Sequence, residues 1–189
     1  VLWRGLDFTV REGHALVVRG ANGSGKTTLL RVLAGLTHAE HGEVQWRGRQ
    51  VRPMAQALRD DLVFIGHAPA LKDELTAFEN LASLVALAAQ HASAQQVGDA
   101  LAALGLSRQS SLPARVLSQG QRRRVHLAKL ALTRRPLWIL DEPATALDAE
   151  GLEWLAATLS AQLARGGIVV TATHAPLPLD AGRMTEVVL

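Results

Sequence analysis

Apolar and polar positions alternate with two periodicities along this chain, one typical of strands and one typical of helices. Strands are predicted at 6–10, 15–18, 43–46, 62–65, 137–140 and 168–171, and helices at 27–36, 118–133 and 149–164. The runs at 137–140 and 168–171 are apolar throughout, as in strands that are buried on both faces. Because such strands alternate with helices, we expect an α/β fold with a mostly parallel core sheet.

The character of the sequence changes between about 76 and 111. This stretch is rich in Ala and Leu and contains no Pro, so it predicts two or three helices. We expect a single domain over 1–189, in which 1–75 and 112–189 form a core and a β subdomain and about 76–111 form a helical insertion. The segment 6–10 already has the pattern of a strand interior, which suggests a truncated N-terminus.

Composition narrows the class of protein. The 189 residues are 48% hydrophobic and 20% charged, with a net charge of +3, which is typical of a globular protein with a sizeable core. The lack of cysteine excludes disulfides and thiolate-bound zinc. No apolar run reaches the roughly 18 residues of a membrane span, so we expect no membrane insertion. Arg122, Arg123 and Arg124 are interpreted as the polar face of a helix, and the charge does not indicate nucleic acid.

A phosphate-binding pattern lies between the second predicted strand and the first predicted helix. The match to G-x-x-x-x-G-K-[ST] consists of Gly20, Ala21, Asn22, Gly23, Ser24, Gly25, Lys26 and Thr27, followed by Thr28. The glycines allow backbone N–H groups to approach phosphates, and a helix N-terminus adds partial positive charge. Lys26 would span the β- and γ-phosphates of ATP, and Thr27 would bind Mg²⁺. A glycine-rich turn that binds nothing is the alternative, which the strand and helix flanks disfavour.

Two acids end the apolar strand at 137–140. An acid at the carboxyl end of such a strand lies beside the phosphate loop in parallel sheets, so Asp141 is a candidate Mg²⁺ ligand. Glu142 is then placed to orient and polarise the attacking water. The alternative is a solvated strand end before a turn at Pro143.

The segment Leu117, Ser118, Gln119, Gly120 and Gln121 resembles the signature motif of the ABC ATPases, with Gln119 where a glycine usually stands. Ser118 is also a candidate N-cap for the helix that follows. Further family elements follow in order. Asp148 matches the D-loop aspartate, and His174 matches the switch histidine near the γ-phosphate.

This resemblance covers nearly the whole chain and implies an ABC nucleotide-binding domain of the P-loop NTPase fold, with an antiparallel β subdomain and a helical insertion. It also implies a homodimer in which ATP lies between the phosphate loop of one chain and the signature segment of the other. His67 occupies the position where the family usually has a glutamine. The aromatic residue that commonly stacks on adenine would precede the start of this sequence, and Trp3 is too near the phosphate loop to be assumed its substitute.

The run at 64–81, with I-G-H-x-P and T-A-x-E-N-L, is similar to the ATP-binding subunit of the cytochrome c maturation haem exporter. That resemblance implies an integral membrane permease as partner and a peripheral location at the cytoplasmic face of a bacterial inner membrane. The alternatives are the ATPase of another small-substrate ABC exporter, a soluble non-transport ABC ATPase, and a module that binds ATP but hydrolyses it poorly because of His67.

Overall fold

A computed structural model describes residues 2–88, 90–174, 177 and 179–189. Its contacts divide the chain into two compact units. Unit 1 comprises Val1–Gly66, Arg135–Pro143 and Leu159–Leu189, and unit 2 comprises His67–Arg134 and Ala144–Thr158. Among the residues described, no helix is both long and apolar enough to cross a membrane.

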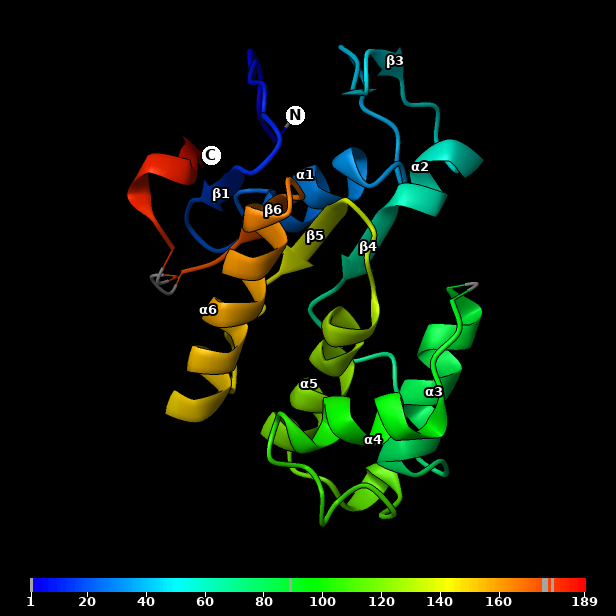
Figure 1. Ribbon diagram of the computed structural model, residues 1–189. Coiled ribbons are helices and arrows are strands. Elements are labelled where there is room, and N and C mark those ends of the chain that lie inside the picture. Colours follow the sequence, from blue (N-terminus) through cyan, green and yellow to red (C-terminus); the bar gives the residue numbers. More distant parts are fainter. Residues whose placement is uncertain (1, 89, 175–176, 178) are drawn as a thin grey trace. The chain divides into compact units, whose positions relative to one another are not determined.

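Unit 1 is built on a parallel sheet of five strands (Figure 1). In spatial order these are β4 (Leu62–Ile65), β5 (Leu137–Asp141), β6 (Ile168–Ala172), β1 (Ala15–Arg19) and β7 (Met184–Val188). Leu16 pairs with Val170, and Val63 pairs with Trp138. Because all the strands run in one direction, their carboxyl ends lie at the same edge of the sheet.

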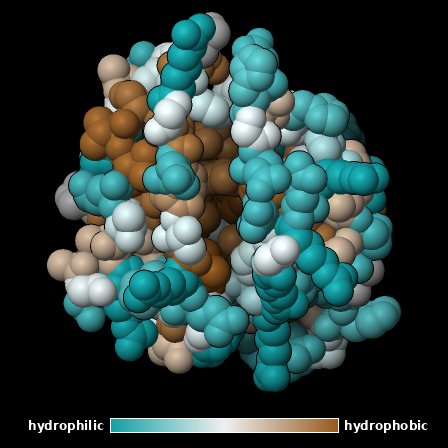
Figure 2. Space-filling model, turned by 90° about the horizontal axis from the view of Figure 1, so that it is seen from above, coloured by the Kyte–Doolittle hydropathy of each residue, from teal (hydrophilic) through white to brown (hydrophobic). Residues whose placement is uncertain are grey.

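Unit 1 also contains two helices, a small hairpin and the last part of a third helix, α6 (Ala149–Ala164). The two helices and the hairpin are α1 (Lys26–Leu33), α2 (Gln56–Asp61), and the antiparallel pair β2 (Gln45–Trp46) and β3 (Arg49–Gln50). A short 3₁₀ turn, Ala181–Arg183, precedes β7. The core joins apolar residues of the sheet to those of the two helices, including Leu16, Leu30 and Leu58. Partly buried apolar side chains surround this core, and Figure 2 shows hydrophobic residues gathered on the face seen from above.

Unit 2 is helical. It contains α3 (Ala77–Leu87), α4 (Ala94–Ala102), α5 (Gln119–Ala128), the 3₁₀ turns Ala114–Val116 and Lys129–Leu132, and the first part of α6 (Ala149–Ala164). Thr76, Ser93 and Ser118 cap α3, α4 and α5, each in a capping box with the residue three positions later. Their apolar faces share one core that includes Leu81, Leu101 and Val125.

The predicted α/β class with a mostly parallel sheet is confirmed, together with a small antiparallel pair. The strand expected at 6–10 is wrong, because no strand is assigned there. The alternation still matches burial, because Leu6, Phe8 and Val10 are half-buried while Asp7 and Thr9 are exposed. The segment simply does not pair with a neighbouring strand as a β-strand would. β7 and α2 lie in segments where no element is predicted. The division into a core, a β subdomain and a helical insertion stays a prediction.

The interpretation of Arg122, Arg123 and Arg124 as the polar face of a helix is wrong for Arg123. Arg123 is only 3% exposed, and its guanidinium donates to the carbonyl of His67. Arg122 pairs with Asp73, and Arg124 also forms an ion pair within unit 2. Since each arginine binds a different segment, the triplet is part of the internal structure of this unit.

Candidate functional site

Three chemically distinctive segments follow the carboxyl ends of neighbouring strands in unit 1. The phosphate loop (residues 20–27) follows β1, Asp141 and Glu142 come at the end of β5, and His174 comes two residues after β6. Because β6 lies between β1 and β5, all three segments emerge at one edge of the sheet. This edge is where ligands bind in parallel α/β sheets.

The phosphate loop ends in a backbone conformation that requires glycine. Gly25 has a φ of 99°, is the N-cap residue of α1, and forms no side-chain cap. A Cβ at this position would lie 2.9 Å from Nε1 of Trp3. The first N–H groups of α1 therefore lack a side-chain acceptor from the cap residue, and such groups at a helix N-terminus suit an anion.

Lys26 is held over this loop. Its side chain is largely buried, and Nζ donates to the carbonyl oxygens of Gly20 and Ala21, each at 2.9 Å. Burial of an ammonium group is costly unless the charge is compensated, and neutral carbonyls compensate it only in part. A phosphate bound at the loop would supply the missing negative charge.

A pair of oxygen ligands lies next to the lysine. The Thr27 hydroxyl donates to Oδ2 of Asp141 at 2.8 Å, and Asp141 is 2% exposed. This hydrogen bond brings together the two residues that the sequence assigns to Mg²⁺. Carboxylate and hydroxyl oxygens are the ligands that Mg²⁺ prefers, so the pair fits this ion.

Glu142 has a left-handed backbone conformation. Its φ is 49°, a conformation that costs a non-glycine residue about 1–2 kcal/mol. Its N–H donates to the carbonyl of Ala172 at 2.9 Å, which continues the β5–β6 pairing past the end of β5. The carboxylate Oε1 lies 3.6 Å from Nε2 of His174. The sharp turn therefore brings the two candidate catalytic side chains together.

The signature segment belongs to unit 2. Ser118 accepts from the N–H of Gln121 at 3.2 Å, and the Gln121 side chain accepts from the N–H of Ser118 at 2.9 Å. The predicted N-cap is thus confirmed. Leu117 is buried in the core of the unit, while Gln119 is exposed. Asp148, which immediately precedes α6, accepts from the N–H of Gly151 in the first turn of that helix at 3.0 Å.

His67 lies where unit 2 begins, and its side chain is exposed. Its carbonyl oxygen accepts from Arg123 at 3.2 Å. Sequence reasoning misses the roles of Arg123 and Arg124, because their partners are distant in the chain. It also misses the contact of Trp3 with Gly25, since the segment that carries Trp3 forms no regular element.

Comparisons with known proteins add the family. Residues 3–145 match the model of the ABC transporter family. The chain is 45% identical to the cytochrome c biogenesis ATP-binding export protein CcmA of Dechloromonas aromatica, over 98% of this chain and 91% of the relative. It is 50% identical to that of Aromatoleum aromaticum over 94% and 84%. With that of Vibrio cholerae the identity is 40% over 99% and 90%.

Solved structures are similar as well. The dimeric post-hydrolysis state of an ATP-binding cassette bound to ADP and Pi matches with a TM-score of 0.80 at 25% identity, over 92% of this chain and 80% of that chain. The ATP-binding subunit of an ABC transporter matches with a TM-score of 0.75 at 28% identity, over 88% and 71%.

Proposed function

The chain belongs to the ABC transporter ATPases, among the cytochrome c biogenesis ATP-binding export proteins, and from this premise we propose its specific role. It hydrolyses ATP for a membrane complex that exports haem for the assembly of c-type cytochromes. The name shared by relatives that are 40–50% identical over nearly the whole chain carries this proposal. The similarity of the 64–81 run to the same family supports it.

Binding of ATP falls to the phosphate loop. The N–H groups of residues 21–27 and the ammonium of Lys26 hold the β- and γ-phosphates. Thr27 and Asp141 would hold Mg²⁺, which would neutralise charge on these phosphates when bound. The hydrogen bond between Thr27 and Asp141 supports this assignment, because it already places both oxygens at one point of the sheet edge.

Glu142, which follows β5, and His174, which comes after β6, are the residues that carry out hydrolysis. Glu142 accepts a hydrogen bond from the attacking water and polarises it toward the γ-phosphate. His174, 3.6 Å from the Glu142 carboxylate, is close enough to orient that side chain. In this proposal it also contacts the γ-phosphate. The strained backbone of Glu142 supports this role, since such strain is concentrated at functional sites.

The active assembly is a homodimer. Unit 1 carries the phosphate loop, Asp141, Glu142 and His174, whereas unit 2 carries the signature segment and Asp148. In the proposed dimer, ATP lies between the phosphate loop of one chain and Ser118–Gln121 of the other. The γ-phosphate then bridges the two chains, and its removal lets them separate, which couples hydrolysis to motion. The dimer acts on an integral membrane permease, as a peripheral subunit at the cytoplasmic face of a bacterial inner membrane.

Substitution of Glu142 tests the ATPase mechanism. Glu142→Gln keeps the shape of the side chain but removes the carboxylate, so we expect ATP binding to persist while turnover falls by about 100-fold or more. The variant should form an ATP-dependent dimer, measured by size exclusion with light scattering. Glu153→Gln, an exposed position of α6, is the matched control and should behave as wild type. Hydrolysis near the wild-type rate in Glu142→Gln would remove Glu142 from its role.

The transport role needs a cellular assay. Deletion of the gene should abolish haem-containing c-type cytochromes, detected by haem staining of membrane proteins. The wild-type gene should restore them and the Glu142→Gln gene should not. Normal c-type cytochromes in the deletion strain would favour export of another small substrate.

A further inference from the structure

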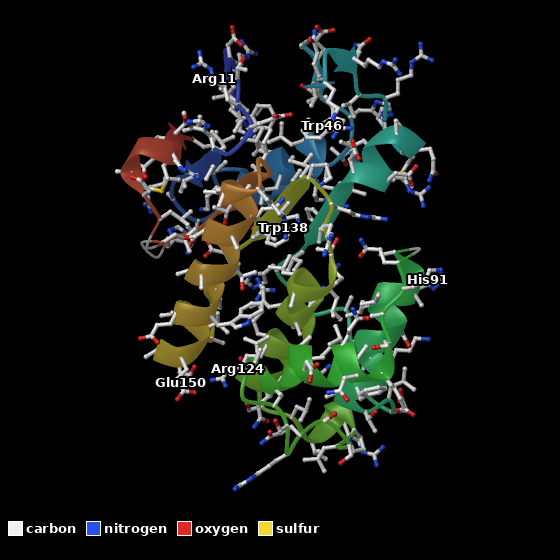
Figure 3. All side chains as sticks on the ribbon, in the orientation of Figure 1. Arg11, Trp46, His91, Arg124, Trp138 and Glu150 are labelled. Carbon is white, nitrogen blue, oxygen red and sulfur yellow. The ribbon has the colours of Figure 1, made fainter. Side chains whose placement is uncertain are left out.

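Arg124 connects two loops of unit 2 that are distant in sequence. From the middle of α5 its guanidinium donates to the carbonyl of Leu104 at 3.1 Å and forms an ion pair with Asp148. Figure 3 shows Arg124 beside the N-terminal end of α6, where Glu150 is labelled. The side chain therefore joins the helix of the signature segment to the segment that precedes α6.

Both members of the ion pair are held by a second contact. The Leu104 carbonyl orients the arginine, whose side chain is 16% exposed, and the Gly151 N–H orients the aspartate, which is 59% exposed. The hydrogen bond from Gly151, together with the charge of Arg124, lowers the pKa of Asp148. Ordinary surface ion pairs are weak because two mobile side chains must be ordered. Here much of that ordering is supplied by the neighbouring backbone.

A second contact joins the same two segments one turn earlier on α5. A Cβ on Gly120 would lie 2.7 Å from the carbonyl oxygen of Ala146, so only glycine permits this approach. Ala146 has a φ of 62°, a strained conformation that persists only where the surroundings determine it. The segment 144–148, called the D-loop below, thus packs closely against α5 at Gly120 and is joined to it by the ion pair of Arg124.

We propose that Arg124 is a positioning residue that fixes the D-loop on the signature helix α5 of the same chain. Asp148 and the signature segment then reach the partner chain's nucleotide with a fixed spacing. This role rests on the proposed sandwich of two chains around ATP. The residues assigned to binding the nucleotide within the same chain belong to unit 1, and Arg124 belongs to unit 2.

The first test measures the local effect in the monomer. In the full-length protein with ADP, Arg124→Ala should raise amide hydrogen exchange in the D-loop by about 5-fold or more, with no change in β1. Arg122→Ala is the matched control, since it removes an ion pair to Asp73 from the same helix and should leave D-loop exchange unchanged. Unchanged D-loop exchange in Arg124→Ala would overturn the proposal, whatever the dimer does.

The second test measures dimerisation in the Glu142→Gln background with MgATP. Arg124→Ala should raise the dimer dissociation constant about 10-fold, while the affinity of the monomer for a fluorescent ATP analogue stays unchanged. Arg124→Lys, which keeps the charge, should recover part of the loss. Asp148→Ala should weaken the dimer as well, and the double variant should lose less than the product of the two single losses, since the ion pair is common to both substitutions. Multiplicative effects of the two substitutions would refute the link.

The two tests separate the possible failures. A Glu142→Gln parent that never dimerises with MgATP would contradict the proposed function, and hydrogen exchange would still decide the role of Arg124. If Arg124→Ala does not fold, Asp148→Asn replaces it, because the aspartate is exposed. That variant should raise D-loop exchange in the same way, and unchanged exchange would again overturn the proposal.

Discussion

Lowering the pH should destabilise this protein through His126, a histidine inside α5. Its side chain is 4% exposed and lies among the core residues of unit 2. Burial, together with the charges of Lys129 and Arg123, lowers the pKa of His126 from 6.5 to about 3. The folded protein therefore holds this imidazole neutral at every pH at which it is ordinarily handled.

The size of this loss in the free energy of unfolding follows from proton linkage. Between pH 6.5 and about 3 the unfolded chain carries a proton on this imidazole and the folded protein does not. Unfolding takes up a proton in this interval, so the free energy of unfolding falls as the pH falls below 6.5. With one pKa unit equivalent to about 1.4 kcal/mol, a change from about pH 7.5 to 5.5 removes about 1.4 kcal/mol. For a chain of this size the melting temperature should fall by about 3–5 °C from this residue alone.

Urea unfolding at several pH values between about 7.5 and 5.5 measures this effect. His126→Gln removes the titrating group, so its free energy of unfolding should depend less steeply on pH by the amount above, whatever its absolute stability. His91→Gln is the control, since His91 is an exposed residue (Figure 3) and its replacement should leave the slope unchanged. The interval lies above the range in which carboxylates protonate. Parallel curves for wild type and His126→Gln would show that the folded protein protonates His126 as readily as the unfolded chain does.

Three further substitutions test the site in unit 1 and the interior of unit 2. Lys26→Ala should weaken ATP and ADP binding by about 10- to 100-fold and leave adenosine almost unaffected, measured by calorimetry, because the phosphates are the only part of the nucleotide assigned to the ammonium; equal weakening for adenosine would contradict this. Asn80→Ala should cost about 2–4 kcal/mol in urea unfolding, since this buried amide bonds to the backbone at Lys72, Leu75 and Thr76, and a cost below about 1 kcal/mol would be inconsistent with these bonds. Gly25→Ala should reduce ATP affinity by at least about 10-fold at equal folded content, because alanine cannot adopt the backbone conformation that Gly25 has in the phosphate loop. Normal binding would refute this.

Elements with a strong one-dimensional pattern can be predicted from the sequence. The helix expected at 149–164 coincides with α6, and the apolar runs at 62–65 and 168–171 correspond to β4 and β6. The phosphate loop is equally predictable, since its chemistry lies within eight consecutive residues. β7 is different, because its pattern is weak and it is a strand only through its pairing with β1. The left-handed backbone of Glu142 has no sequence signal either, as glutamate rarely adopts it.

The arginine triplet is a part of the structure that the sequence does not predict. Successive residues of a helix are about 100° apart, so three consecutive arginines span about 200°, which fits within the polar face of an amphipathic helix. Helical geometry therefore allows all three side chains to face solvent, yet Arg123 is only 3% exposed. A charge persists in such a place only if it is bound to other groups. The sequence cannot predict the partners, because the Leu104, Asp148 and His67 groups lie 20, 24 and 56 residues from their arginines. Charged donors are costly in a protein interior. The contacts of Arg123 and Arg124, which tie the His67 segment and the D-loop to the signature helix, account for charged residues at these two positions.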